Sequence, residues 1–235
     1  MDPDLQKISD NYSAMWEESQ QDIRIGKNET DPLPLESGSR WGMSIIFRPT
    51  EPVLSRLAES AKNIALYSGA SQIIYNQKNI HTTILSVDFF HNIVQENDPR
   101  AKIYIEIMEI VANRHSRFFH RYEGVTANRM GVLAQGWPIG NSLKVIRDNL
   151  REELGRRNML NGPEKENRRI TSHSSLSVFT HSLSNPVGLV DYIEKNRTYD
   201  FGQCGVDALE LVSYIRTMTD VEVVSHAHVL LHDSR

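Results

Sequence analysis

The spacing of apolar residues predicts two kinds of element along this chain. Apolar residues that recur every three or four positions, such as Leu54, Leu57 and Ala61, indicate a helix with one buried face. Short runs in which apolar and polar residues alternate indicate strands. The first pattern predicts helices over residues 1–26, 51–68, 98–114, 141–154 and 185–193. The second predicts strands over residues 41–47, 79–85, 117–125, 128–137, 170–179, 208–215 and 221–231.

Proline and small polar residues mark several boundaries. Asp98–Pro99 and Asn185–Pro186 each place a capping residue before a proline at the first helical position. Thr50 is expected to cap the helix over 51–68. Residues 26–40 are rich in turn formers and predict a linker. We therefore expect an N-terminal helical extension with its linker, residues 1–40, and one body, residues 41–235.

The order of these elements indicates the fold class. Helices and strands are mixed, and short connections join several strand pairs, including the last two strands around "RTMTD". This order favours an α+β fold with antiparallel-rich sheets over a regular series of parallel βαβ units. Residues 155–169 are highly charged and are expected to form a loop.

Composition narrows the class of protein. The 235 residues are 39% hydrophobic and 24% charged, which is ordinary for a soluble globular protein, and no apolar run is long enough to span a bilayer. A net charge of −4 argues against a broad surface that tracks long nucleic acid, but not against a small anionic ligand. Cys204 is the single cysteine, so a disulfide framework is excluded, and we expect a cytoplasmic protein with no disulfide-linked partner. The oligomeric state stays open.

Two of the predicted strands carry a histidine followed, two residues later, by a hydroxyl residue. Successive side chains of a strand alternate between its faces, so His81 shares a face with Thr83, and His173 with Ser175. The sequence "HDS" at 232–234 has the same spacing, and chance alone supplies about one such triplet in a chain of this composition. The first two copies stand out because both lie on apolar strands in comparable halves of the chain. Each histidine is either a hydrogen-bonded core residue or part of a site.

Two histidines of this kind suit acid–base chemistry at phosphorus. Because free imidazole titrates near neutral pH, one ring can be neutral while the other is protonated. The neutral ring removes a proton from the nucleophile, and the protonated ring donates one to the departing oxygen. The hydroxyls of Thr83 and Ser175 can donate to the phosphoryl oxygens, where negative charge develops. This scheme needs no metal ion and no cofactor.

These motifs resemble the signature of the 2H phosphoesterase superfamily, which has two His-x-(Thr/Ser) motifs on strands, one in each lobe of a two-lobed α+β fold. "IHTTIL" at 80–85 and "SHSSLSV" at 172–178 carry the resemblance, which covers residues 41–231. It implies a central cleft lined by His81, Thr83, His173 and Ser175. It also implies a phosphodiesterase whose partner is a nucleotide or a short RNA, with a 2′,3′-cyclic phosphate, a cyclic phosphate of ADP-ribose, or a 2′–5′ or 3′–5′ linkage as the scissile group.

Other residues are candidates for binding, each with a structural alternative. Trp137 could stack on a base, and Arg168, next to Arg169, could attract a phosphate. Tyr75 lies close to the first motif in the sequence. Packing or solvation also explains the presence of each of these residues. His226, His228 and His232 lack further ligands at a suitable spacing, so no metal site is expected, and a structural role suffices for His115 and His120. A nucleotide- or RNA-binding module without turnover and an RNA ligase-like enzyme remain the alternatives. The sequence does not say which histidine is the base.

Overall fold

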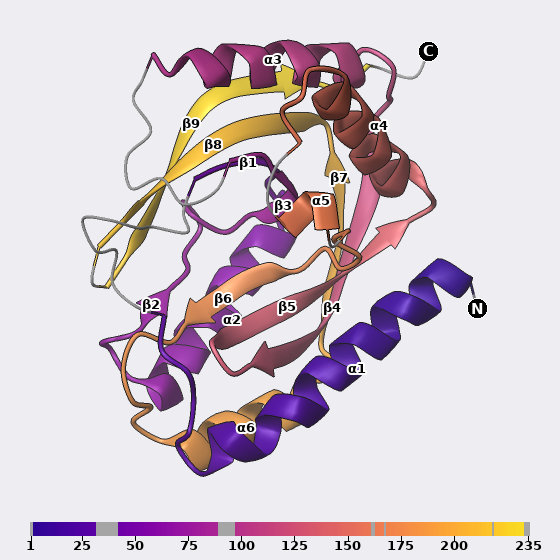
Figure 1. Ribbon diagram of the computed structural model, residues 1–235. Helices are drawn as coiled ribbons and strands as arrows, with labels where there is room; N and C mark the ends of the chain where they lie inside the picture. Colours follow the sequence, from indigo (N-terminus) through magenta and orange to yellow (C-terminus); the bar gives the residue numbers. More distant parts are fainter. Residues whose placement is uncertain are drawn as a thin grey trace.

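The computed structural model of the protein describes residues 2–31, 42–88, 97–160, 163–166, 168–217 and 219–232 (Figure 1). The helices are α1 Pro3–Arg24, α2 Val53–Ser68, α3 Pro99–Ala112, α4 Ser142–Arg156, α5 Pro163–Glu166 and α6 Pro186–Lys195. The strands are β1 Met43–Phe47, β2 Ile73–Ile74, β3 Thr82–Ser86, β4 Phe118–Asn128, β5 Gly131–Ile139, β6 Ser174–Val178, β7 Asp200–Val206, β8 Ala208–Arg216 and β9 Val221–Leu230. Within these ranges no helix has both the length and the apolar character that crossing a lipid bilayer requires.

The strands of the described residues form one curled, nine-stranded sheet. Its order is β7-β4-β5-β6-β3-β1-β8-β9, with β2 beside β6, and these strands pair antiparallel. The sheet has two halves, one on each side of the β6–β3 junction. That junction consists of a single pair of residues, Thr82 and Ser174, which we call the seam. The predicted α+β class with antiparallel strands is confirmed.

Helices cover both halves of the sheet (Figure 1). α3 packs on β8 and β9 and α4 on β3, whereas α2 and α6 pack on the half that contains β4, β6 and β7. The apolar face of α2 is fully buried, as the zero exposure of Leu57, Ala61 and Ile64 shows. Burial of such faces, rather than helix propensity, is the main source of helical stability in a protein of this kind.

The helix α1 packs against β4, β5 and α6 through its apolar stripe. Ile8, Tyr12, Trp16 and Ile23 are buried on it. The hydroxyl of Tyr12 donates to the carbonyl of Gly136 over 3.3 Å and accepts from the N–H of Gly136 over 3.0 Å. The part of the predicted linker between residues 32 and 40 lies outside the described residues, so the division into an extension and a body stays a prediction.

Several boundaries differ from the sequence expectations. α2 begins after Pro52 and has no side-chain cap, so the expected role of Thr50 was wrong. β7 was not predicted, because Gly202 and Gly205 interrupt its alternation. Gly202 has a φ of +101°, a conformation that favours glycine. Both motif histidines precede their strands by one residue, since β3 begins at Thr82 and β6 at Ser174.

Candidate functional site

The seam brings the two His-x-(Thr/Ser) motifs together. Thr82 pairs with Ser174, and these two side chains meet on one face, where the hydroxyl oxygens lie 2.8 Å apart. The Tyr122 hydroxyl closes this contact at 2.6 Å from the oxygen of Thr82. All three residues are fully buried. Because side chains alternate along a strand, the residues on either side of Thr82 and Ser174 belong to the opposite face.

On that opposite face the antiparallel register sets each histidine beside the hydroxyl residue of the other motif. Continued from the seam, the register brings His81 level with Ser175 and Thr83 level with His173. Two tyrosines join the four residues. Tyr75 hydrogen-bonds Ser175 and its ring centroid lies 6.2 Å from that of His81, while Tyr214 hydrogen-bonds Thr83. The register places the two rings near each other, and a charge on His81 accordingly lowers the pKa of His173.

His81 is held by the backbone. Its Nδ1–H donates to the carbonyl of Asn79 over 2.7 Å, which leaves the lone pair on Nε2. Nε2 lies 3.4 Å from the hydroxyl of Tyr214. The side-chain amide of Asn79 donates to the carbonyl of Val221 over 3.1 Å, and this bond fixes the segment that orients the ring. Burial lowers the pKa of His81 to about 4, against a partial rise from the Asn79 carbonyl, so the ring is neutral at pH 7 in the free protein.

His173 has a different environment. Its Nδ1 lies 3.3 Å from the hydroxyl oxygen of Thr171, a group that can donate or accept, and the side chain is half-buried. Burial, together with the smaller effects of the Arg169 and Arg147 guanidinium groups, lowers the pKa of His173 to about 3. This ring is therefore also neutral at pH 7 in the free protein.

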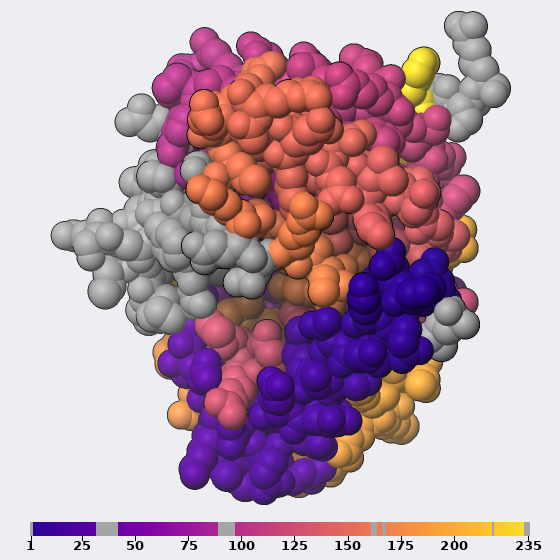
Figure 2. Space-filling view, turned by 45° about the vertical axis from the view of Figure 1, so that its right-hand side comes forward, coloured from indigo at the N-terminus to yellow at the C-terminus, as the bar shows by residue number. Residues whose placement is uncertain are grey.

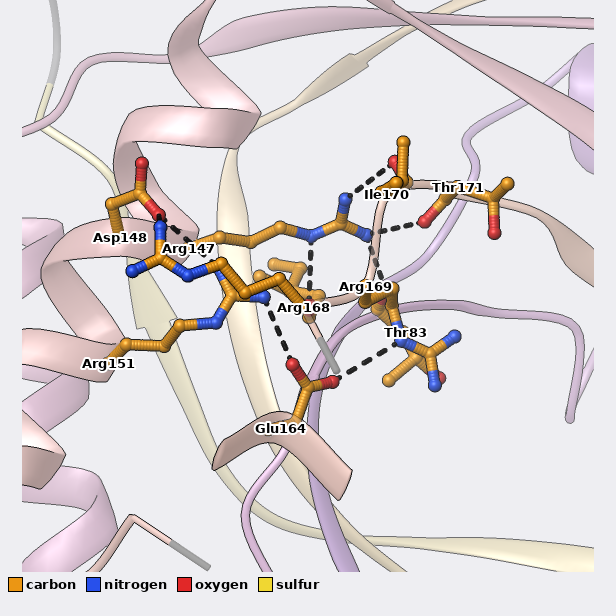
Figure 3. Close-up of polar contacts among 10 residues, drawn as sticks. Thr83, Arg147, Asp148, Arg151, Glu164, Arg168, Arg169, Ile170 and Thr171 are labelled. Atoms are coloured by element: carbon orange, nitrogen blue, oxygen red, sulfur yellow. Dashed lines mark hydrogen bonds and ion pairs between the residues drawn. The ribbon is translucent and has the colours of Figure 1, made fainter. Parts of the chain in front are cut away.

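A buried arginine joins the two sides of the seam (Figure 3). The guanidinium of Arg147, on α4, donates to the carbonyls of Ile84 and Thr83 on β3 over 2.9 and 3.2 Å. It also donates to the carbonyls of Ile170 and Thr171, which lead into β6, over 3.3 and 2.9 Å. Burial lowers the pKa of Arg147 to about 9, so the group keeps its positive charge at neutral pH. This charge lies close to the site, because it lowers the pKa of His173.

Further cations surround this arginine in Figure 3. Arg151 pairs with the buried Glu164 at 3.0 Å, and the Nε of Arg169 lies 3.5 Å from the other oxygen of the same carboxylate. The charge of Arg169 lowers the pKa of both His81 and His173. The face with the histidines is therefore electropositive, although the chain as a whole carries a net charge of −4.

Comparison with known proteins identifies the fold. TT0787 of Thermus thermophilus matches with a TM-score of 0.61 at 13% identity, over 82% of this chain and 99% of its own. A protein described as a phosphoesterase matches with a TM-score of 0.54 at 11% identity, over 83% of this chain and 100% of its own. LigT of E. coli in complex with 3′-AMP matches with a TM-score of 0.55 at 10% identity, over 83% of this chain and 100% of its own. No protein-family model matches the chain, and no curated protein is similar to it in sequence.

The chain has the 2H phosphoesterase fold. At 10–13% identity this likeness concerns the fold, and the resemblance predicted from the two motifs is confirmed at that level. The chemistry has to be argued from the side chains of this chain. In the 2H phosphoesterase fold of this protein, the four motif residues meet at the seam, with Tyr75 from the loop that follows β2.

The other predicted binding residues lie in different surroundings. The Trp137 indole donates to the carbonyl of Glu123 over 2.9 Å, and its ring contacts Tyr12 edge-on with centroids 5.5 Å apart. Arg168 is exposed and lies 3.7 Å from Asp148. It is Arg169 rather than Arg168 whose charge acts on the histidines.

Three other histidines have local partners. His226 bonds the hydroxyl of Ser213 at 2.7 Å, His120 bonds Ser172 at 2.9 Å, and His115 bonds Asn149 at 2.8 Å. Residues 233–234 of the third histidine triplet lie outside the described residues. Among the residues that the structure describes, no group of three or more His, Cys, Asp or Glu side chains is arranged to hold a metal ion.

Sequence reasoning missed Tyr214 and Arg147. A signal for Arg147 was present, because it falls on the apolar stripe of its helix between Leu143, Leu150 and Leu154. A charged residue at a buried position of an amphipathic helix requires partners for its donors. No comparable signal marks Tyr214, whose strand reads as an ordinary buried one.

Proposed function

We propose that this protein is a phosphodiesterase that hydrolyses a 2′,3′-cyclic nucleotide phosphate or a short oligonucleotide linkage, with His81 and His173 as its acid–base pair. The observation that carries the proposal is the seam, at which two imidazoles and two hydroxyls from distant parts of the chain share one face. Solved structures of the similarly folded LigT of E. coli in complex with 3′-AMP, NADP+ and ATP support a nucleotide as the ligand class.

The reaction divides between the two rings. A water oxygen attacks phosphorus while His173 accepts the proton of that water, and the bond from phosphorus to one ribose oxygen breaks as His81 donates a proton to this oxygen. The products are a phosphomonoester and a free ribose hydroxyl. The hydroxyls of Thr83 and Ser175 donate hydrogen bonds to the non-bridging oxygens as their charge increases.

The environments of the rings support this assignment of roles. The carbonyl of Asn79 accepts the Nδ1–H of His81 and stabilises its protonated form, which leaves Nε2–H as the proton to be donated. Burial, together with the charges of Arg169 and Arg147, lowers the pKa of His173 and keeps it in the neutral form, which accepts a proton. Binding of an anionic phosphate raises the pKa of both rings, so the substrate itself favours protonation of His81.

A panel of substrates tests the proposal. The protein is incubated with 2′,3′-cyclic mononucleotides, a cyclic phosphate of ADP-ribose, and 2′–5′ and 3′–5′ dinucleotides, and the products are identified by mass. We expect a gain of one water in at least one of them, and no product from His173→Ala protein purified in the same way. Ligand binding without any product would instead indicate a binding module, and joined oligonucleotides would indicate a ligase.

A further inference from the structure

A cavity of about 530 Å³ lies between α1 and α4, and Arg147, which bonds the carbonyls of Thr83 and Thr171, forms part of its wall. Leu5, Lys7 and Ile8 line it from α1, and the segment 168–170 closes another side. Figure 2 shows this part of α1, in indigo, lying against the orange segment of the chain. The hydrolysis proposed above does not use this space, which we call the α1–α4 cavity.

The α1–α4 cavity is basic in an acidic protein. Six cationic side chains line it against three carboxylates, and the buried Glu164 lies behind two of the six, Arg151 and Arg169. Lys7 and Arg168 are exposed at its wall, whereas Arg147 and Arg151 are buried. The Nε of Arg169 is buried and makes no hydrogen bond within the described residues, although it lies 3.5 Å from the carboxylate of Glu164. Such a cluster attracts an anion, and arginine in particular suits phosphate oxygens.

Two residues that line the α1–α4 cavity, Arg147 and Arg169, also act on the histidine site. Arg169 lines the cavity, and its charge reaches both His81 and His173. Arg147 lines it as well, and its guanidinium bonds the carbonyls of Thr83 and Thr171 beside those histidines. A ligand with its scissile phosphate between the imidazoles can therefore extend past Arg169 into the cavity.

The remaining wall is apolar. Leu5, Ile8 and Leu143 contribute to it, together with Pro138 and Ile170. A pocket that combines an apolar wall with a few placed cations suits a group that has a flat apolar part and a phosphate. A nucleotide has both of these features.

We propose that the α1–α4 cavity binds a second nucleotide of the substrate, and that the preferred substrate is an oligonucleotide with at least one phosphate besides the scissile one. This proposal rests on the function proposed above and specifies its substrate class. TT0787 matches over 99% of its length to 82% of this chain, so part of this chain has no counterpart there.

Binding tests this independently of turnover. In His173→Ala protein, calorimetry compares a dinucleotide that carries a 3′-terminal phosphate with the corresponding nucleoside 3′-monophosphate. A charge-assisted bond to a second phosphate predicts that the dinucleotide binds about tenfold more tightly. Adding Lys7→Glu or Arg168→Glu reverses one charge at the cavity, and each should reduce this advantage to less than about threefold.

The control is Lys62→Glu, which makes the same charge change at an exposed position of α2, outside the cavity. Equal affinity for the two ligands, or an advantage that survives both charge reversals, refutes the cavity proposal. An advantage in binding without turnover of any substrate in the panel refutes the hydrolase and retains the cavity. Turnover of a panel substrate without tighter binding of the dinucleotide refutes the cavity proposal and retains the hydrolase.

Discussion

The two sides of the site have nearly the same sequence and backbone register but different surroundings. On one side His81 is buried and held by the backbone carbonyl of Asn79. On the other side His173 is half-buried and faces the hydroxyl of Thr171, and the charges of Arg169 and Arg147 add to the effect of burial in lowering its pKa. The repeated motif thus supplies two similar imidazoles. The different residues around each imidazole favour different roles for the two rings, acid and base, in the proposed reaction.

The largest effects are expected from removing either ring. His81→Ala and His173→Ala should each lower kcat by about 10²–10⁴-fold, because each removes one proton transfer. A phosphodiester with a p-nitrophenolate leaving group separates the two roles, since this leaving group departs without a proton. On that substrate His81→Ala should regain most of its activity and His173→Ala should not.

His181→Ala is the matched control, because His181 is exposed and bonds Thr180 and Ser71. Its kcat should equal that of the unmodified protein. Recovery of His173→Ala instead of His81→Ala would reverse the assignment of acid and base, and equal recovery of both would show that the two sides are chemically equivalent.

Removing a hydroxyl of the site should have the next largest effect. Thr83→Val and Ser175→Ala each take away one donor to the phosphoryl oxygens, and we expect kcat to fall by about 10²-fold with little change in KM. Steady-state kinetics measures both values. The comparison variant is Ser177→Ala on the same strand as Ser175, whose side chain is buried. A loss confined to KM would show that the hydroxyls bind the ground state only.

Arg147 stabilises both sides at once, so its replacement should affect stability. Arg147→Met leaves four carbonyls without their donor, and we expect the free energy of unfolding to fall by about 2–3 kcal/mol. Urea denaturation followed by circular dichroism measures this change. Arg156→Met, which removes a guanidinium at the exposed end of the same helix, should cost less than about 1 kcal/mol. Equal losses in the two variants would contradict the role given to Arg147.

The smallest effect is a shift in pH dependence. The charge of Arg169 lowers the pKa of both histidines, so Arg169→Gln should raise both pKa values and move the two limbs of the kcat/KM profile to higher pH. The limb that depends on His173 should move further, because Arg169 is the largest charge effect on that ring. Histidine titration by NMR gives the same two values without substrate. Arg168→Gln should leave them in place, and a profile that moves equally in both variants would point to a general charge effect.

Local features of the sequence predicted the two motifs, most of the elements and the fold class. His-x-Thr and His-x-Ser are patterns that span only three residues. The helix starts at Pro99 and Pro186 follow from the capping residues directly before them, Asp98 and Asn185. The pairing of Thr82 with Ser174 joins residues 92 positions apart, so no local pattern encodes it. The same holds for Tyr214 and Arg169, whose importance arises only when distant strands meet. β7 was missed because glycine weakens the alternation that identifies a strand.

The seam has a mechanical consequence. One ladder pair, the hydroxyl contacts of Thr82 with Ser174 and Tyr122, and the fork of Arg147 join the halves of the sheet, whereas β4 and β5 are joined along eight paired positions. The gap between the imidazoles is therefore set at the narrowest connection in the sheet. Mild heating or low denaturant should open this connection first, so that catalytic function disappears while most of the secondary structure is still intact.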